Sequence, residues 1–218
     1  RQCCCIGFTI GGKVLRARHR AVEQAGITYA LTAAVLGQLF KMCCLGHGQR
    51  NPDPVLCHCG LLGEFGQRAE WAHDGALDWD ALGVPAHAGI QRWVADLNAF
   101  YRREPALYEV DFEGAGFEWI DHGDADASVL SFLRRPKAGP PVLAVCNFTP
   151  VPRENYVVGA PGSGFWREML NSDAAHYGGS GMGNMGGVEA APVPAQGRLH
   201  SLVLTLPPLA TIFLQPER

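Results

Sequence analysis

The sequence predicts a mainly β protein, in which an all-β sandwich forms the C-terminal part and one amphipathic helix precedes it. Short apolar runs bounded by Gly and Pro recur through the second half of the chain, as they do in β-sandwiches. One earlier segment, residues 87–103, instead repeats its apolar residues at steps of three and four. Because 47% of the 218 residues are hydrophobic, the chain can bury a substantial core.

Residues 1–61 differ in composition from the rest of the chain. Seven of the eight cysteines lie before residue 60, and Lys and Arg outnumber Asp and Glu there, whereas acids outnumber cations beyond it. We interpret residues 1–61 as a separate Cys-rich segment that is either non-native sequence, such as a frame-shifted stretch, or disordered. Because the sequence begins at Arg1 rather than Met, we also expect it to be a piece of a longer protein.

The clustered cysteines raise two alternatives, a zinc site and a disulfide framework. The candidate zinc ligands are Cys43, Cys44, His47, Cys57 and Cys59. Structural zinc sites usually pair their ligands as Cys-x2-Cys, and adjacent cysteines reach one tetrahedral ion poorly. Disulfides are rare in the reducing cytosol, which is the compartment that we expect for this chain. We therefore predict no metal site and no cofactor.

The amphipathic helix is predicted over His87–Arg103. Arg102, Arg103 and Pro105 close it, because cations favour the C-terminal end of a helix and proline cannot continue it. We expect its apolar stripe to pack into the core rather than to bind a ligand. The stripe consists of Ile90, Trp93, Val94, Leu97, Phe100 and Tyr101.

After Pro105 the apolar runs shorten to strand length. Ser201–Leu206 alternates cleanly, with three leucines on one face, and we expect Trp166 to lie in the sandwich core. The expected strands are Phe117–Ile120, Ser128–Arg134, Val142–Phe148, Asn155–Val158, Phe165–Leu170, Ser201–Leu206 and Ala210–Leu214.

Two motifs have structural explanations. Gly181–Gly186 matches the dinucleotide-binding pattern G-x-G-x-x-G, but no strand-turn-helix context surrounds it, so we predict a mobile connection between strands. Asp121–Asp124 contains acids, a histidine and a glycine, and we predict a turn there rather than a ligand cluster.

The informative motif is Gly63-Glu64-Phe65-Gly66-Gln67, followed by Glu70-Trp71 and by His73–Trp79. It resembles the segment that closes the eighth strand of the (β/α)8 barrel in branching enzymes of the α-amylase superfamily. The resemblance implies that residues 62–105 are the last strand, loop and helix of that catalytic barrel and that residues 106–218 are the all-β sandwich domain. Other stretches that resemble the family are His87–Leu107, Phe117–Asp121, Asn147–Arg153, Trp166–Asp173, His176–Ser180 and His200–Ala210.

This resemblance implies a glycosyltransferase of glycogen biosynthesis, which passes an α-1,4-glucan chain to a 6-hydroxyl. Such retaining chemistry requires a carboxylate nucleophile and a carboxylic acid about 5 Å apart. The family carries these groups upstream of the matched segment, so we assign no catalytic residue and predict that the chain alone is inactive. The alternative is a stand-alone glucan-binding or interaction module built on the β-sandwich.

The barrel-like segment supplies the candidate site residues. Trp71, Asp78 and Trp79 are candidates for substrate binding, because indole faces stack on sugar rings and carboxylates accept hydroxyl hydrogen bonds. The alternative is that both tryptophans only fix the loop. The resemblance implies that Glu64 is the acid nearest to the face of the barrel that carries active sites, and we expect it to support the site without acting as a catalyst.

The expected partners are α-1,4-glucan or glycogen and the missing N-terminal part of the parent chain. A formal net charge of −3 gives no field that favours nucleic acid. No apolar run reaches the roughly 20 residues that span a bilayer, so we expect a cytoplasmic protein without membrane association.

Overall fold

The computed structural model describes residues 79–217 of the chain. A short 3-10 helix, η3 (Trp79–Gly83), leads into helix α3 (Pro85–Arg103), and eight strands follow. The strands are β1 (Phe117–Asp121), β2 (Val129–Arg134), β3 (Val142–Asn147), β4 (Arg153–Ala160), β5 (Gly164–Asn171), β6 (Gly187–Ala190), β7 (His200–Leu206) and β8 (Ala210–Pro216). Three further 3-10 turns are η4 (Pro105–Leu107), η5 (Gly114–Gly116) and η6 (Ala175–Tyr177).

Helix α3 confirms the predicted amphipathic helix and begins two residues earlier than expected. Pro85 occupies its first turn, where the missing N–H of proline costs nothing. The helix ends where Glu104 adopts an extended backbone and its N–H still donates to the carbonyl of Phe100, at 3.0 Å. Pro105 then disfavours further helix, because it restricts the backbone of the residue before it.

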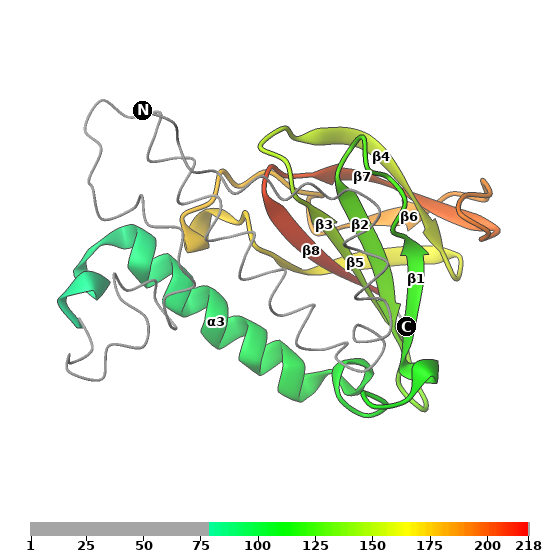
Figure 1. Cartoon of the computed structure of the whole chain (residues 1–218), viewed down its shortest axis with the longest axis horizontal. Helices are drawn as coiled ribbons and strands as arrows, with labels where there is room; N and C mark the ends of the chain where they lie inside the picture. The colour runs from blue at the N-terminus through cyan, green and yellow to red at the C-terminus, as the bar shows by residue number, and fades with distance from the viewer. Residues whose placement is uncertain (1–78, 218) are drawn as a thin grey trace.

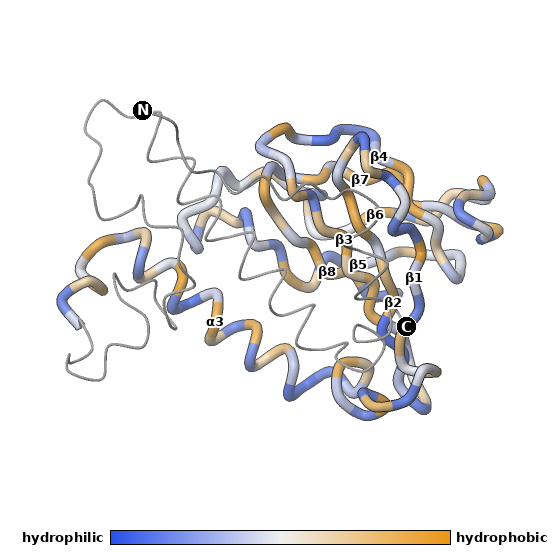
Figure 2. Tube along the Cα trace, in the orientation of Figure 1, coloured by the Kyte–Doolittle hydropathy of each residue, from blue (hydrophilic) through white to orange (hydrophobic). Residues whose placement is uncertain are grey.

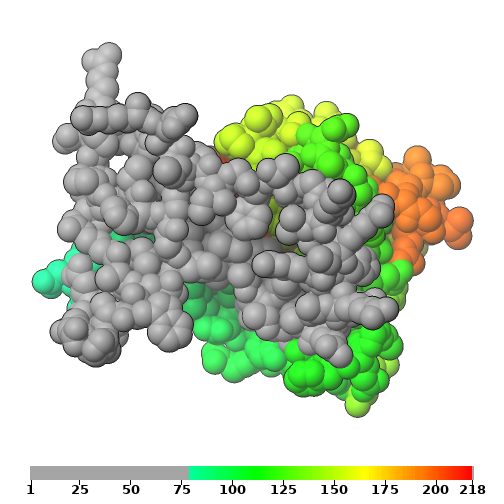
Figure 3. Space-filling view, viewed as in Figure 1, coloured from blue at the N-terminus to red at the C-terminus, as the bar shows by residue number. Residues whose placement is uncertain are grey.

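The strands form two antiparallel sheets, which confirms the predicted sandwich. The larger sheet has the order β1-β2-β3-β8-β5-β6, and the smaller one consists of β4 and β7. Figure 1 shows β4 and β7 above the larger sheet and α3 running below it. The segment that connects β6 to β7 projects from the sandwich, as the orange part of Figure 3 shows.

One core fills the space between the two sheets. Leu202, Leu204 and Leu206 of β7 are buried in it, whereas Val203 points outward, as the predicted alternation requires. Trp166 of β5 is fully buried in the same core, which confirms its predicted place. These contacts join the smaller sheet to the larger one.

A second core lies between α3 and the opposite face of the larger sheet. Trp93, Leu97 and Phe100 contribute the helix side, and the ring centroids of Phe100 and Phe213 of β8 are 5.6 Å apart. Figure 2 shows apolar and polar residues alternating along α3, as one buried face requires. Because the larger sheet is covered on both faces, β3 is buried along its whole length, which explains its continuous apolar run.

Two local features differ from the expectations. Strand β6 was not predicted, because it has four residues and begins at Gly187 with a φ of 153°. Strand β4 begins at Arg153, ahead of the expected start, and Asn155, with a φ of 55°, lies at a shift in its register with β7. The Asp121–Asp124 turn is confirmed, since the Gly123 N–H donates to Asp121 Oδ1 at 2.8 Å.

Candidate functional site

Of the predicted substrate-binding residues, Trp79 lies in the described part of the chain. It opens η3 directly before α3, and 60% of its surface is exposed. Trp71, Asp78 and Glu64 lie outside the described residues, so their grouping with Trp79 stays a prediction. What the structure adds is the way in which the sandwich holds the helix that follows Trp79.

Helix α3 meets the η6 turn at an unusually close backbone contact. A Cβ atom placed on Gly89 would lie 2.2 Å from the carbonyl oxygen of Tyr177, so only glycine allows this approach. The rings of Trp93 and Tyr177 pack edge to face, with centroids 5.0 Å apart. Arg92 also donates a hydrogen bond to the carbonyl of His176.

The Tyr177 hydroxyl adds a polar contact to this junction. It donates to Asp96 Oδ2 on α3 at 2.6 Å, across 81 residues of sequence. Burial raises the pKa of Tyr177 above its ordinary value, and the hydrogen bond to Asp96 and the charge of Asp96 raise it further. The junction therefore combines packing, a glycine contact and a buried hydroxyl.

The Gly181–Gly186 segment is held by side chains of neighbouring strands, so the prediction of a mobile connection is wrong. Asn184 Nδ2 donates to Glu168 Oε2 of β5 at 2.7 Å, and Asn184 Oδ1 accepts from the Thr205 N–H of β7 at 2.8 Å. Asn171 Nδ2 donates to the carbonyl of Met182 at 2.9 Å. The glycines give the loop its path, and the amides fix it in place.

Sequence reasoning missed both of these clusters. Asn171-Ser172-Asp173 lies four residues before a glycine-rich stretch that begins at Gly178, and such residues commonly bind nearby backbone groups. In the structure, the Ser180 N–H donates to Asp173 Oδ1 at 2.9 Å. The long-range partners Asp96 and Gly89 gave no comparable signal, because the contact depends on how α3 crosses the sheet.

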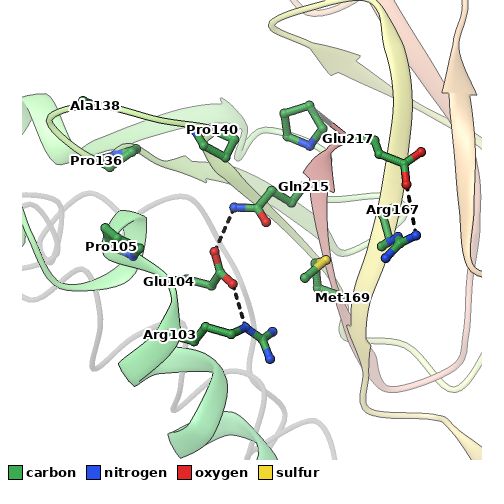
Figure 4. A pocket seen from close by; sticks show the side chains of 11 residues that line it. Arg103, Glu104, Pro105, Pro136, Ala138, Pro140, Arg167, Met169, Gln215 and Glu217 are labelled. Atoms are coloured by element: carbon green, nitrogen blue, oxygen red, sulfur yellow. Dashed lines mark hydrogen bonds and ion pairs between the residues drawn. The ribbon is translucent and has the colours of Figure 1, made fainter.

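An open cavity of about 500 Å³ lies where α3 ends (Figure 4). Four stretches of the chain form its walls: the end of α3, the turn between β2 and β3, the middle of β5 and the end of β8. The lining residues are Arg103, Glu104, Pro105, Pro136, Ala138, Pro140, Arg167, Met169, Gln215, Pro216 and Glu217.

Metal-binding and nucleophilic groups are sparse in residues 79–217. Within that range no three His, Cys, Asp or Glu side chains are placed to share a metal ion. Burial raises the pKa of the Cys146 thiol to about 11, so this cysteine is a poor nucleophile. None of the helices in the described range has both the length and the apolar character that a membrane crossing needs. The candidate zinc ligands Cys43–Cys59 lie outside this range.

Two antiparallel sheets packed around a common core define the class of this part of the chain, an all-β sandwich. Residues 119–217 match the family described as "Alpha amylase, C-terminal all-beta domain".

The longer matches are to branching enzymes. The chain is 62% identical over 172 residues to the 1,4-alpha-glucan branching enzyme GlgB of Aromatoleum aromaticum, a match that covers 79% of this chain and 27% of the relative. The corresponding enzymes of Albidiferax ferrireducens (59% identity; 78% and 27% covered) and Aquifex aeolicus (58% identity; 79% and 27% covered) match similarly. The predicted resemblance to the C-terminal part of branching enzymes of the α-amylase superfamily is confirmed.

The chain spans about a quarter of the length of these relatives. Coverage of 79% is more of the chain than residues 62–218 contain, so the match reaches into the segment before residue 62. At least part of residues 1–61 therefore lies within the match, and the division of the chain at residue 61 stays a prediction. Among solved structures, trehalulose synthase MutB from Pseudomonas mesoacidophila MX-45 is similar at 22% identity and a TM-score of 0.34, covering 58% of this chain and 17% of that one.

Proposed function

We propose that this chain is the C-terminal portion of a 1,4-α-glucan branching enzyme of glycogen biosynthesis, which transfers an α-1,4-glucan chain to a 6-hydroxyl. The observation that carries the proposal is the 62% identity over 172 residues to such an enzyme. The parent protein is a glycosyltransferase, and its partners are α-1,4-glucan and the N-terminal portion of the same chain. We place it in the cytoplasm, where glycogen is made.

The chain alone is inactive in this proposal. Retaining transfer needs two carboxyl groups about 5 Å apart that both reach the sugar. In the described residues, the carboxylates that line the cavity or hold the Gly181–Gly186 loop are already hydrogen-bonded to other side chains. Glu104 binds Arg103 and Gln215, Glu217 binds Arg167, and Glu168 binds Asn184. The arrangement is that of an accessory domain.

We propose that barrel sequence ends near residue 105 and that residues 106–218 form the sandwich domain. The tight contact between α3 and η6 supports a rigid junction between the two, because Gly89, Trp93 and Asp96 on the helix all meet Tyr177. The sandwich thereby fixes the last helix of the barrel.

Trp71, Asp78 and Trp79 are proposed to border the glucan path, with Glu64 supporting them. The exposed indole of Trp79 just ahead of α3 supports this proposal, since a sugar ring can reach an exposed ring face. Replacing Trp79 by Ala in the complete enzyme is expected to raise the KM for amylose and leave the melting temperature unchanged. A lower melting temperature with unchanged kinetics would mean that Trp79 only fixes the loop.

The proposed function is tested by a chimera. The C-terminal region of the Aromatoleum aromaticum enzyme is replaced by the matched region of this chain, and the iodine stain of amylose is followed. We expect the chimera to branch amylose and the isolated chain to leave the stain unchanged. An inactive but folded chimera would contradict the proposal, and branching by the isolated chain would overturn its claimed inactivity.

A further inference from the structure

The charged side chains that line the cavity at the end of α3 cancel in pairs. Arg103 Nε lies 2.9 Å from Glu104 Oε1, and Arg167 Nη2 lies 3.0 Å from Glu217 Oε1 (Figure 4). Two cations and two anions leave no net charge, so the cavity wall favours neither a phosphate nor a metal cation. It offers donors and acceptors side by side, which suits a neutral ligand that has both.

Part of this polar surface is fixed before any ligand arrives. Gln215 Nε2 donates to Glu104 Oε2 at 3.0 Å, so both oxygens of a carboxylate that is only 12% exposed are held in position. Each carboxylate oxygen can accept two hydrogen bonds, so one acceptor site on each oxygen of Glu104 remains for a ligand hydroxyl. Preorganised groups lose little conformational entropy on binding.

The apolar part of the wall is rigid. It consists of proline rings and Met169, and proline side chains have almost no rotamer entropy to lose. Pockets that combine such surfaces with a few convergent polar groups are typical of small-ligand sites, and about 500 Å³ lies within their usual size. No aromatic ring is among the lining residues, so we expect weaker binding than an exposed tryptophan would give. The prolines are Pro105, Pro136, Pro140 and Pro216.

From these features we propose that the cavity binds a short α-1,4-glucan, whose hydroxyl groups meet the paired charges and whose C–H surfaces meet the prolines. It is separate from the Trp79 edge, because Trp79 precedes α3 and Arg103 ends it. A helix of 19 residues is about 28 Å long at 1.5 Å per residue. The choice of a glucan as the neutral ligand rests on the proposed function.

The test titrates maltoheptaose into the whole chain and follows binding by calorimetry. The variant Arg167→Ala with Glu217→Ala removes one exposed ion pair from the cavity and leaves the net charge unchanged. Each hydrogen bond lost is expected to weaken binding about fivefold. The matched control is Arg102→Ala with Glu154→Ala, which removes the same charges from exposed positions that do not line the cavity.

Weaker binding by the cavity variant and unchanged binding by the control would support the proposal. Absence of maltoheptaose binding to the unaltered chain would overturn it, and so would equal binding by all three proteins. Near-ultraviolet circular dichroism checks that the variants keep their packing. If the chimera branches amylose while the chain fails to bind maltoheptaose, the cavity proposal alone is wrong; if the chimera does not branch, the proposed function fails.

Discussion

Gly89 lets helix α3 approach the sandwich more closely than any other residue would. Replacing glycine by alanine inside a helix normally stabilises it by about 1 kcal/mol. Here the added methyl group would collide with the carbonyl of Tyr177, so we expect Gly89→Ala to destabilise the protein by about 1–3 kcal/mol. Urea unfolding measures the change. Gly162→Ala is the control, because its Cβ would meet open space, and a stabilised Gly89→Ala would show that the helix can shift without loss.

The Tyr177 hydroxyl is the polar counterpart of this contact. Tyr177→Phe keeps the ring against Trp93 and removes the hydrogen bond to Asp96, so we expect a loss of about 1 kcal/mol at neutral pH. Tyr108→Phe serves as the matched control, since that ring is partly exposed. Equal melting temperatures of the two variants would mean that the hydroxyl contributes nothing to stability.

The pH dependence of stability follows from the same hydroxyl. Because the folded protein has a Tyr177 pKa above that of an unfolded tyrosine, which is about 10, the unfolded chain loses this proton first as the pH rises. The stability that the protonated Tyr177 hydroxyl contributes is complete below about pH 10, the pKa of an unfolded tyrosine. It decreases as the pH rises from there toward the higher pKa of the folded state. Stability between pH 9 and pH 11 should therefore fall less steeply in Tyr177→Phe than in the unaltered protein. The Tyr156 hydroxyl donates to Asp124 at 2.7 Å, and its pKa is raised in the same way. Tyr156 therefore makes the stability of the variant and of the unaltered protein fall with pH by the same additional amount.

The loop between η6 and β6 shows how side chains decide whether an element is rigid. Asn184 joins it to β5 through Glu168 and to β7 through Thr205, so we expect Asn184→Ala to cost about 1–3 kcal/mol. Hydrogen exchange of the Thr205 amide should speed up in this variant. The neighbouring Met185 is fully exposed, and Met185→Ala should change neither quantity. Unaltered exchange in Asn184→Ala would mean that the glycines alone fix the loop.

Elements with a strong local pattern could be predicted from the sequence, and those defined by distant partners could not. Helix α3 and β7 each carry one repeating apolar face, and the structure differs from the expectation by two residues or fewer at their ends. Strand β6 has no such face, since it is an edge strand paired only with β5. The glycines in residues 181–186 predicted a mobile loop. The groups that fix the loop through Asn184, the Glu168 carboxylate and the Thr205 N–H, lie on β5 and β7 and are distant in sequence.

At the scale of the whole molecule, the larger sheet is a shared wall between two cores. The smaller sheet covers one face and α3 covers the other, so neither cover can be removed without exposing apolar side chains. The candidate site was predictable only as a motif, because Trp71 and Asp78 are linked to Trp79 by sequence likeness alone. The cavity at the far end of α3 had no sequence signal, since its walls come from four separated stretches.

Removing helix α3 should therefore unfold or aggregate the sandwich. A chain starting at Glu104 would expose Phe132, Phe213 and their neighbours on the larger sheet. Each large apolar side chain left in water costs about 1.5–3 kcal/mol, and several together approach the 5–15 kcal/mol that holds a typical domain folded. We expect this chain to bind the dye ANS and to melt at a lower temperature, whereas a chain starting at Trp79 should do neither. If the shorter chain stays monomeric and melts at the same temperature without binding ANS, the sandwich does not depend on the helix, and the rigid junction proposed between barrel and sandwich is wrong.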